Sequence, residues 1–204
     1  MSAAERFPQD VAELLSLFEP AQARQAIQAV PGCGLKVPVW ILGSSLFGAQ
    51  LAATLGLPYG FASHFAPEML LDAIDVYRRY FQPSPRLAKP HVMLGINCVL
   101  ADTDAEARRL FTSAQQQFTN LFRGAPGKMQ PPLDSMDNYW TPSEKAGVER
   151  ALHFAIVGAP DSARAQLAEF IARTGADELM LTAQIYDHQA RLHSYELAAT
   201  LRAD

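Results

Sequence analysis

The stretch VPVWILGSSLFGAQLAATLGLPYGFASHFAP, residues 37–67, contains two apolar segments separated by a helical pattern. The segment Val37–Leu42 is apolar almost throughout, which is typical of a strand that is buried on both faces. Leu46–Leu55 is an alanine-rich amphipathic stretch, and Tyr59–Ser63 is a second apolar segment. A strand, a helix and a second strand in this order predict two parallel strands joined by a right-handed crossover.

The same alternation continues along the rest of the chain. Further strands are predicted at Val92–Leu100 and Glu178–Ile185, with a shorter extended segment at His153–Val157. The remaining helical patterns lie at Pro8–Phe18, Pro67–Phe81, Asp104–Phe122, Ser162–Thr174 and Tyr186–Leu201. Strands that alternate with helices predict an α/β fold with a parallel sheet, either a (β/α) barrel or a doubly wound sheet.

Composition and charge exclude several classes of protein. The chain has 204 residues and a formal net charge of -4, with both signs interspersed, so it lacks the basic face that nucleic-acid binding needs. No apolar run reaches the roughly 18 residues that span a bilayer. The N-terminus does not read as a signal peptide, so a cytoplasmic protein is expected. Cys33 and Cys98 suggest neither a disulfide framework nor a metal site.

The turn Gly43-Ser44-Ser45 lies between the first predicted strand and the following helix. A helix N-terminus carries unpaired N–H groups and a partial positive charge, so glycine and serine there can bind a phosphate. The alternative is an ordinary N-cap serine beside a turn glycine, which is far more common. The turn matches neither a nucleophile elbow nor a P-loop nor a GxGxxG fingerprint.

Two further features are candidates for function. His64 directly follows the second strand, where it could act as a general acid or base, or could simply cap the next helix. The segment Arg123–Pro142 is long and rich in Pro, Gly and Met, which is typical of an active-site lid or of a packed surface excursion.

Residues 37–67 resemble the segment around the fifth strand of the flavin-dependent, luciferase-like monooxygenases, a superfamily of TIM barrels. Other segments resemble the same family in the same order. INCVLADTDAEARRLF (96–111) resembles its seventh strand and the following helix, and VGAPDSARAQLAEFIARTGADELMLT (157–182) the helix that leads to its eighth strand. DHQARLHSYELAA (187–199) resembles the closing helix of one subgroup.

The resemblance implies a partial TIM (β/α)8-type barrel, with about strands five to eight in a single domain over residues 1–204. It implies FMN as cofactor, with a deazaflavin as the alternative, and an FMN-phosphate site made by Gly43, Ser44, Ser45 and the backbone of Gly48. His64 becomes the candidate catalytic residue, and no metal is expected.

The activity implied is that of a monooxygenase, which acts on a small organic substrate with molecular oxygen. The alternative is a non-catalytic half-barrel that has lost flavin binding, and a sugar-phosphate TIM barrel is a weaker possibility. Because half a barrel exposes two strand edges and an apolar face, we expect a homodimer or a higher homo-oligomer. Two copies of four strands could together supply the eight strands of a barrel.

Overall fold

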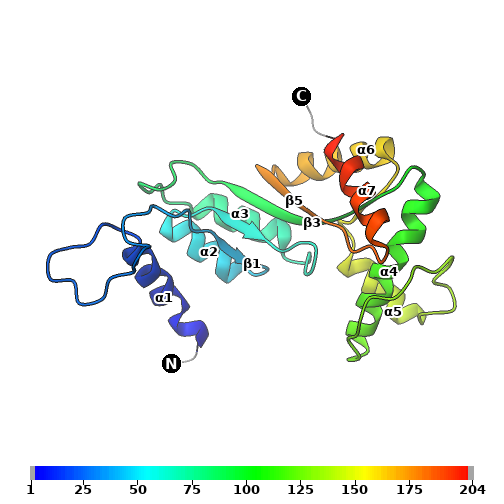
Figure 1. The fold of residues 1–204 in the computed structure, drawn as a ribbon, viewed down its shortest axis with the longest axis horizontal. Coiled ribbons are helices and arrows are strands. Elements are labelled where there is room, and N and C mark those ends of the chain that lie inside the picture. The colour runs from blue at the N-terminus through cyan, green and yellow to red at the C-terminus, as the bar shows by residue number, and fades with distance from the viewer. Residues whose placement is uncertain (1–2, 202–204) are drawn as a thin grey trace.

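Figure 1 shows the computed structural model of the chain, which describes residues 3–201. The long strand β3 (Val92–Leu100) connects one end of the molecule, which carries α1 to α3, with the other end, which carries α4 to α7. The strands are β1 (Ile41–Gly43), β2 (Tyr59–Phe61), β3, β4 (Ile156–Gly158) and β5 (Glu178–Thr182). The helices are α1 (Ala3–Leu17), α2 (Leu46–Leu55), α3 (Leu70–Tyr80), α4 (Asp104–Phe122), α5 (Pro142–Ala151), α6 (Pro160–Thr174) and α7 (His188–Ala199).

The sheet has five parallel strands, and four of them are neighbours in the order expected for consecutive strands of a barrel. β1 pairs with β2, β2 pairs with β3, and β3 pairs with β5. The register sets Leu42 beside Gly60 and Gly60 beside Met93. This arrangement confirms the predicted α/β fold with a parallel sheet of a partial TIM-barrel type.

The residues of β3 alternate between two environments. Val92, Leu94 and Ile96 are completely buried in a core cluster that includes residues of α2 and α3. Because side chains alternate along a strand, Met93, Gly95 and Asn97 lie on the opposite face. We call that face the open face and define it by the residues that share it through the strand register: Leu42, Gly60, Met93, Gly95, Asn97, Glu178, Met180 and Thr182.

The strand boundaries differ from the predicted ones where pairing partners end. β1 begins at Ile41 rather than Val37, because its partner β2 begins only at Tyr59, which is the residue paired with Ile41. β5 ends at Thr182 rather than Ile185, since beyond Asn97 the residues of β3 pair with β4. The predictions for β3, α2 and α4 are correct to the residue.

Helix α5 was not predicted, and the short extended segment predicted before α6 is β4. α5 carries only one buried residue, Val148, so it lacks a clear apolar stripe. Its start was nevertheless encoded, because Thr141 and Glu144 form a capping box with a proline in the first turn. No helix in residues 3–201 is long and apolar enough to cross a membrane.

Candidate functional site

The serine turn, Gly43-Ser44-Ser45, connects the carboxyl end of β1 to the start of α2. Ser45 occupies the N-cap position with extended backbone angles, but its side chain makes no capping hydrogen bond. Within the described chain, the backbone N–H groups of Leu46, Phe47 and Gly48 make no hydrogen bond either. Ser45 is exposed and Ser44 is half-buried. The turn therefore presents free hydroxyl and N–H donors at a helix N-terminus.

Two buried residues, Tyr59 and Gly48, contact this turn from the protein interior. The hydroxyl of Tyr59 donates a hydrogen bond to the carbonyl oxygen of Ser45 over 3.2 Å. Burial raises the pKa of Tyr59, so this phenol stays a donor. Gly48 is buried, and a Cβ at this position would lie 3.6 Å from the Tyr59 ring and 3.9 Å from the Cα of Gly43. These are ordinary van der Waals distances, so the first turn of α2 is in contact with the end of β1.

His64 lies in the turn after β2, the strand that pairs with β1. The N–H of Ala62 donates to the carbonyl of Gly43 over 2.9 Å, which joins the two turns directly. Both turns follow the carboxyl ends of parallel strands, where the functional groups of barrel enzymes lie. The structure therefore places the serine turn and His64 at the carboxyl ends of the paired strands β1 and β2.

A set of polar contacts around His64 was not predicted from the sequence. The side-chain amide of Asn97 donates to the carbonyl of His64 over 2.7 Å. Thr182 donates its hydroxyl to the amide oxygen of Asn97 over 3.1 Å. The hydroxyl of Ser63 donates to the carbonyl of Gly95 over 2.6 Å. The one sequence signal for this set was a buried Asn within the otherwise apolar strand VMLGINCVL.

The ends of the other strands carry weaker candidates. Beyond β3, Asp102 accepts a hydrogen bond from Nε2 of His193 over 2.8 Å, and Nδ1 of that ring lies 3.5 Å from Glu196. Asp102 first and Glu196 second raise the pKa of His193. Beyond β5, Tyr186 is exposed. The histidine is thus an exposed link between α7 and the end of β3.

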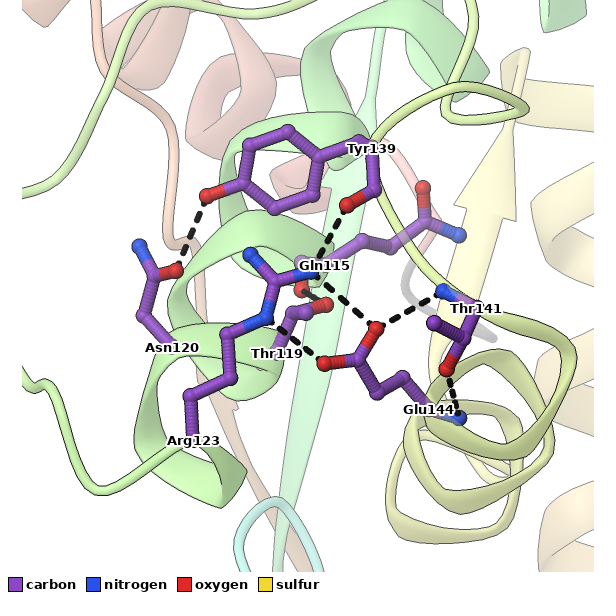
Figure 2. A network of polar contacts seen from close by, with 7 residues as sticks. All are labelled: Gln115, Thr119, Asn120, Arg123, Tyr139, Thr141 and Glu144. Atoms are coloured by element: carbon purple, nitrogen blue, oxygen red, sulfur yellow. Dashed lines mark hydrogen bonds and ion pairs between the residues drawn. The ribbon is translucent and has the colours of Figure 1, made fainter.

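The long segment after α4 is fastened to α4 and α5, as Figure 2 shows. The guanidinium of Arg123 donates to both carboxylate oxygens of Glu144 and to the carbonyl of Tyr139. The hydroxyl of Tyr139 donates to the side chain of Asn120 over 2.9 Å. Thr112 hydrogen-bonds both backbone groups of Leu133. These contacts lie at the α4–α5 end of the molecule, whereas β1 lies near its middle (Figure 1).

The site is an open surface rather than a closed cavity. A cavity of about 650 Å³ lies between the start of α3, α5 and Arg173, and its lining contains no residue of the serine turn. Leu42 is 70% exposed and Met180 is 55% exposed, both on the open face.

The chain matches the family of luciferase-like monooxygenases over residues 7–178. It is 50% identical over 200 residues to a luciferase-like monooxygenase of Escherichia coli K12, an alignment that covers 98% of this chain and 60% of that protein. The chain therefore spans about 60% of the length of the curated relatives that it matches.

Solved structures share the fold. Apo-MsnO8 aligns with a TM-score of 0.80 and 26% identity, over 98% of this chain and 61% of that one. The oxygenating constituent of a 3,6-diketocamphane monooxygenase of Pseudomonas putida, in complex with FMN, aligns with a TM-score of 0.56 and 20% identity. This alignment covers 87% of this chain and 52% of that one. An F420-dependent secondary alcohol dehydrogenase aligns with a TM-score of 0.63 and 12% identity, over 98% of this chain and 62% of that one. The family match and the E. coli relative establish that the chain belongs to the luciferase-like monooxygenase family.

Proposed function

We propose that the chain contributes the phosphate-binding part of an FMN site in an oxygen-dependent monooxygenase that acts on a small organic substrate. The observation that carries this proposal is the state of the serine turn. Ser45 is at the N-cap of α2 and leaves both its own hydroxyl and the first-turn N–H groups without a protein partner. A phosphate would satisfy these donors and would interact favourably with the helix dipole.

The residues of the serine turn would bind the phosphate through two kinds of donor, backbone N–H groups and side-chain hydroxyls. Gly43 and Gly48 allow close approach of backbone, and the N–H of Gly48 faces no protein acceptor. Ser44 and Ser45 add hydroxyl donors, which makes the cradle specific for an anionic group. His64, whose ring lies over Gly95 of β3, would contact the flavin ring or the substrate as the candidate catalytic residue. On the neighbouring open face, the His64 ring lies over Gly95 of β3, and the side chains of Leu42 and Met93 lie over Gly60 of β2.

The bound cofactor would supply the redox chemistry with oxygen, and the protein would orient the reactants and exclude water. FMN is favoured over a deazaflavin because a solved relative of the same fold was obtained with FMN and acts as an oxygenating component. F420-dependent enzymes with the same fold make the deazaflavin the second candidate. The lid role of 123–142 requires the Arg123–Glu144 contacts to open or to act at the rim of a more complete site.

We further propose that residues 1–204 form one domain that works in a homodimer or higher oligomer in the cytoplasm. The exposed apolar groups of the open face, Leu42 and Met180, favour such association. The second candidate function, a half-barrel without flavin binding, is favoured by one observation. Relatives are longer, and this chain spans about 60% of their length, so much of a complete ring pocket lies outside it.

Titration of the purified chain with FMN tests the proposal. Flavin fluorescence should be quenched saturably in the parent chain, and Ser45→Ala and Ser44→Ala should each weaken binding about tenfold, since a hydrogen bond to a charged group contributes about 1.5–3 kcal/mol. Ser143→Ala is the matched control, because this serine is exposed in α5, away from the turn. Absence of binding at high micromolar FMN would support the non-catalytic half-barrel.

A further inference from the structure

The imidazole of His64 rests directly on the backbone of β3. A Cβ built on Gly95 would lie 2.4 Å from Nδ1 of His64 and 3.0 Å from its Cε1. No side chain larger than hydrogen fits there unless the ring moves. Gly95 belongs to the open face, so the ring covers this part of the face.

The two ring nitrogens of His64 are in different surroundings. Nδ1 is buried and makes no hydrogen bond. Nε2 also has no hydrogen-bond partner in residues 3–201, but unlike Nδ1 it is not buried, so it remains accessible. An orphaned N–H is rarer in protein interiors than an acceptor with a free lone pair. In the neutral ring, the lone pair therefore belongs on Nδ1 and the hydrogen on Nε2.

The backbone of His64 is held by a relay across two strands. Asn97 donates to the His64 carbonyl over 2.7 Å, and Asn97 is 3% exposed. Thr182 donates to the amide oxygen of Asn97 over 3.1 Å and sits opposite it in the β3–β5 register. The threonine hydroxyl thus fixes which end of the Asn97 amide faces His64.

We propose that Asn97 and Thr182 are positioning residues, which fix the backbone of His64 so that its ring lies over Gly95, and that the ring there is the Nε2–H tautomer, with Nε2–H as a hydrogen-bond donor to a ligand on the open face. In this arrangement Nε2–H of His64 donates to an acceptor such as a flavin carbonyl. The identity of the ligand rests on the FMN function proposed above, whereas the tautomer and the relay do not.

Nitrogen-15 spectra of the histidine rings in the full chain at pH 8 test the relay, with His64→Gln used to assign the signal. The parent chain should show the Nε2–H pattern for His64. Thr182→Val removes the hydroxyl at nearly constant shape and should shift this signal toward the average of both tautomers. Thr182→Ser keeps the hydroxyl and should retain the parent pattern. Gly95→Ala should displace the ring and change the signal as well.

An Nδ1–H pattern in the parent chain would overturn the proposal, and so would a Thr182→Val spectrum that equals the parent's. FMN provides the second measurement. Addition of FMN should shift Nε2 of His64, and Thr182→Val should weaken FMN binding about three- to tenfold, the effect of one neutral hydrogen bond. Binding of FMN with no change at Nε2 would overturn the donor role. Failure of FMN to bind would count against the cofactor alone, because the tautomer comparison is made without it.

Discussion

At the scale of single residues, the buried hydroxyl of Tyr77 joins two loops at the amino ends of β2 and β3. It donates to the carbonyl of Leu57 over 2.9 Å and accepts from the N–H of His91 over 3.1 Å. Tyr77→Phe leaves both backbone groups without this partner, so we expect the free energy of unfolding to fall by about 1–3 kcal/mol. Urea denaturation measures this change. Tyr80→Phe, on an exposed ring of the same helix, should change it by less than about 0.5 kcal/mol.

Single residues also show what the sequence could and could not reveal. The serine turn was predictable, because it follows an apolar strand segment and precedes a helical pattern in a continuous stretch of chain. Asn97 and Thr182 were not predictable as partners of His64. Their contacts depend on the register between β3 and β5, whose paired residues are 85 positions apart in the sequence. Local patterns carry no information on such a register.

At the scale of elements, the end of α2 depends on Gly56. This residue has a φ of +59° in the C-cap, and a Cβ there would lie 2.5 Å from the carbonyl oxygen of Gln82. Gly56→Ala should therefore lower the free energy of unfolding by about 2 kcal/mol or more, measured by urea denaturation. Gly127→Ala is the matched control, since nothing lies within 4 Å of a Cβ at that exposed position. Equal stability of the two variants would contradict the expected clash.

The loop before α5 should respond to acid through Glu144. The guanidinium of Arg123 first, and the N–H of Thr141 second, lower the pKa of Glu144 to about 2. A carboxyl with a lowered pKa in the folded state contributes stability above its usual value of 4.5, and this contribution is lost as the pH falls toward 2. We expect the fluorescence of Trp140, in a Trp40→Phe background, to change across that window.

Glu144→Gln should abolish that transition, because the glutamine does not titrate. Glu149→Gln provides the control, since Glu149 only faces Lys145 at 3.8 Å on the exposed side of the same helix. A transition that persists in Glu144→Gln would assign the change to another carboxyl. This element also marks a limit of prediction, because α5 is held by its capping box and ion pair rather than by an apolar stripe.

At the scale of the whole molecule, the sequence predicted the order of the main strands. It also predicted a partial barrel, because it contains fewer strand segments than the eight of a TIM barrel. Apolar strand segments that alternate with helices specify parallel neighbours, and β1, β2, β3 and β5 are neighbours in that order. The extra strand β4 interrupts this rule, since it pairs with the last residues of β3. The sequence predicted it as a short extended segment at His153–Val157, but its pairing with the end of β3 has no local signal.

The same count gives the last prediction. In residues 3–201, β1 pairs only with β2 and β5 only with β3, so the sheet has two open edges beside an exposed apolar face. Such edges and faces drive association. Size-exclusion chromatography with light scattering at micromolar concentration should therefore give a mass at least twice that of one chain.

Leu42→Lys and Met180→Lys place charges on the open face and should shift the mass toward the monomer. Leu192→Lys, on an exposed leucine of α7 outside the open face, should not. A monomeric parent chain would show that neither the open edges nor the apolar face drives self-association at this concentration. The prediction of a homo-oligomer would then be wrong.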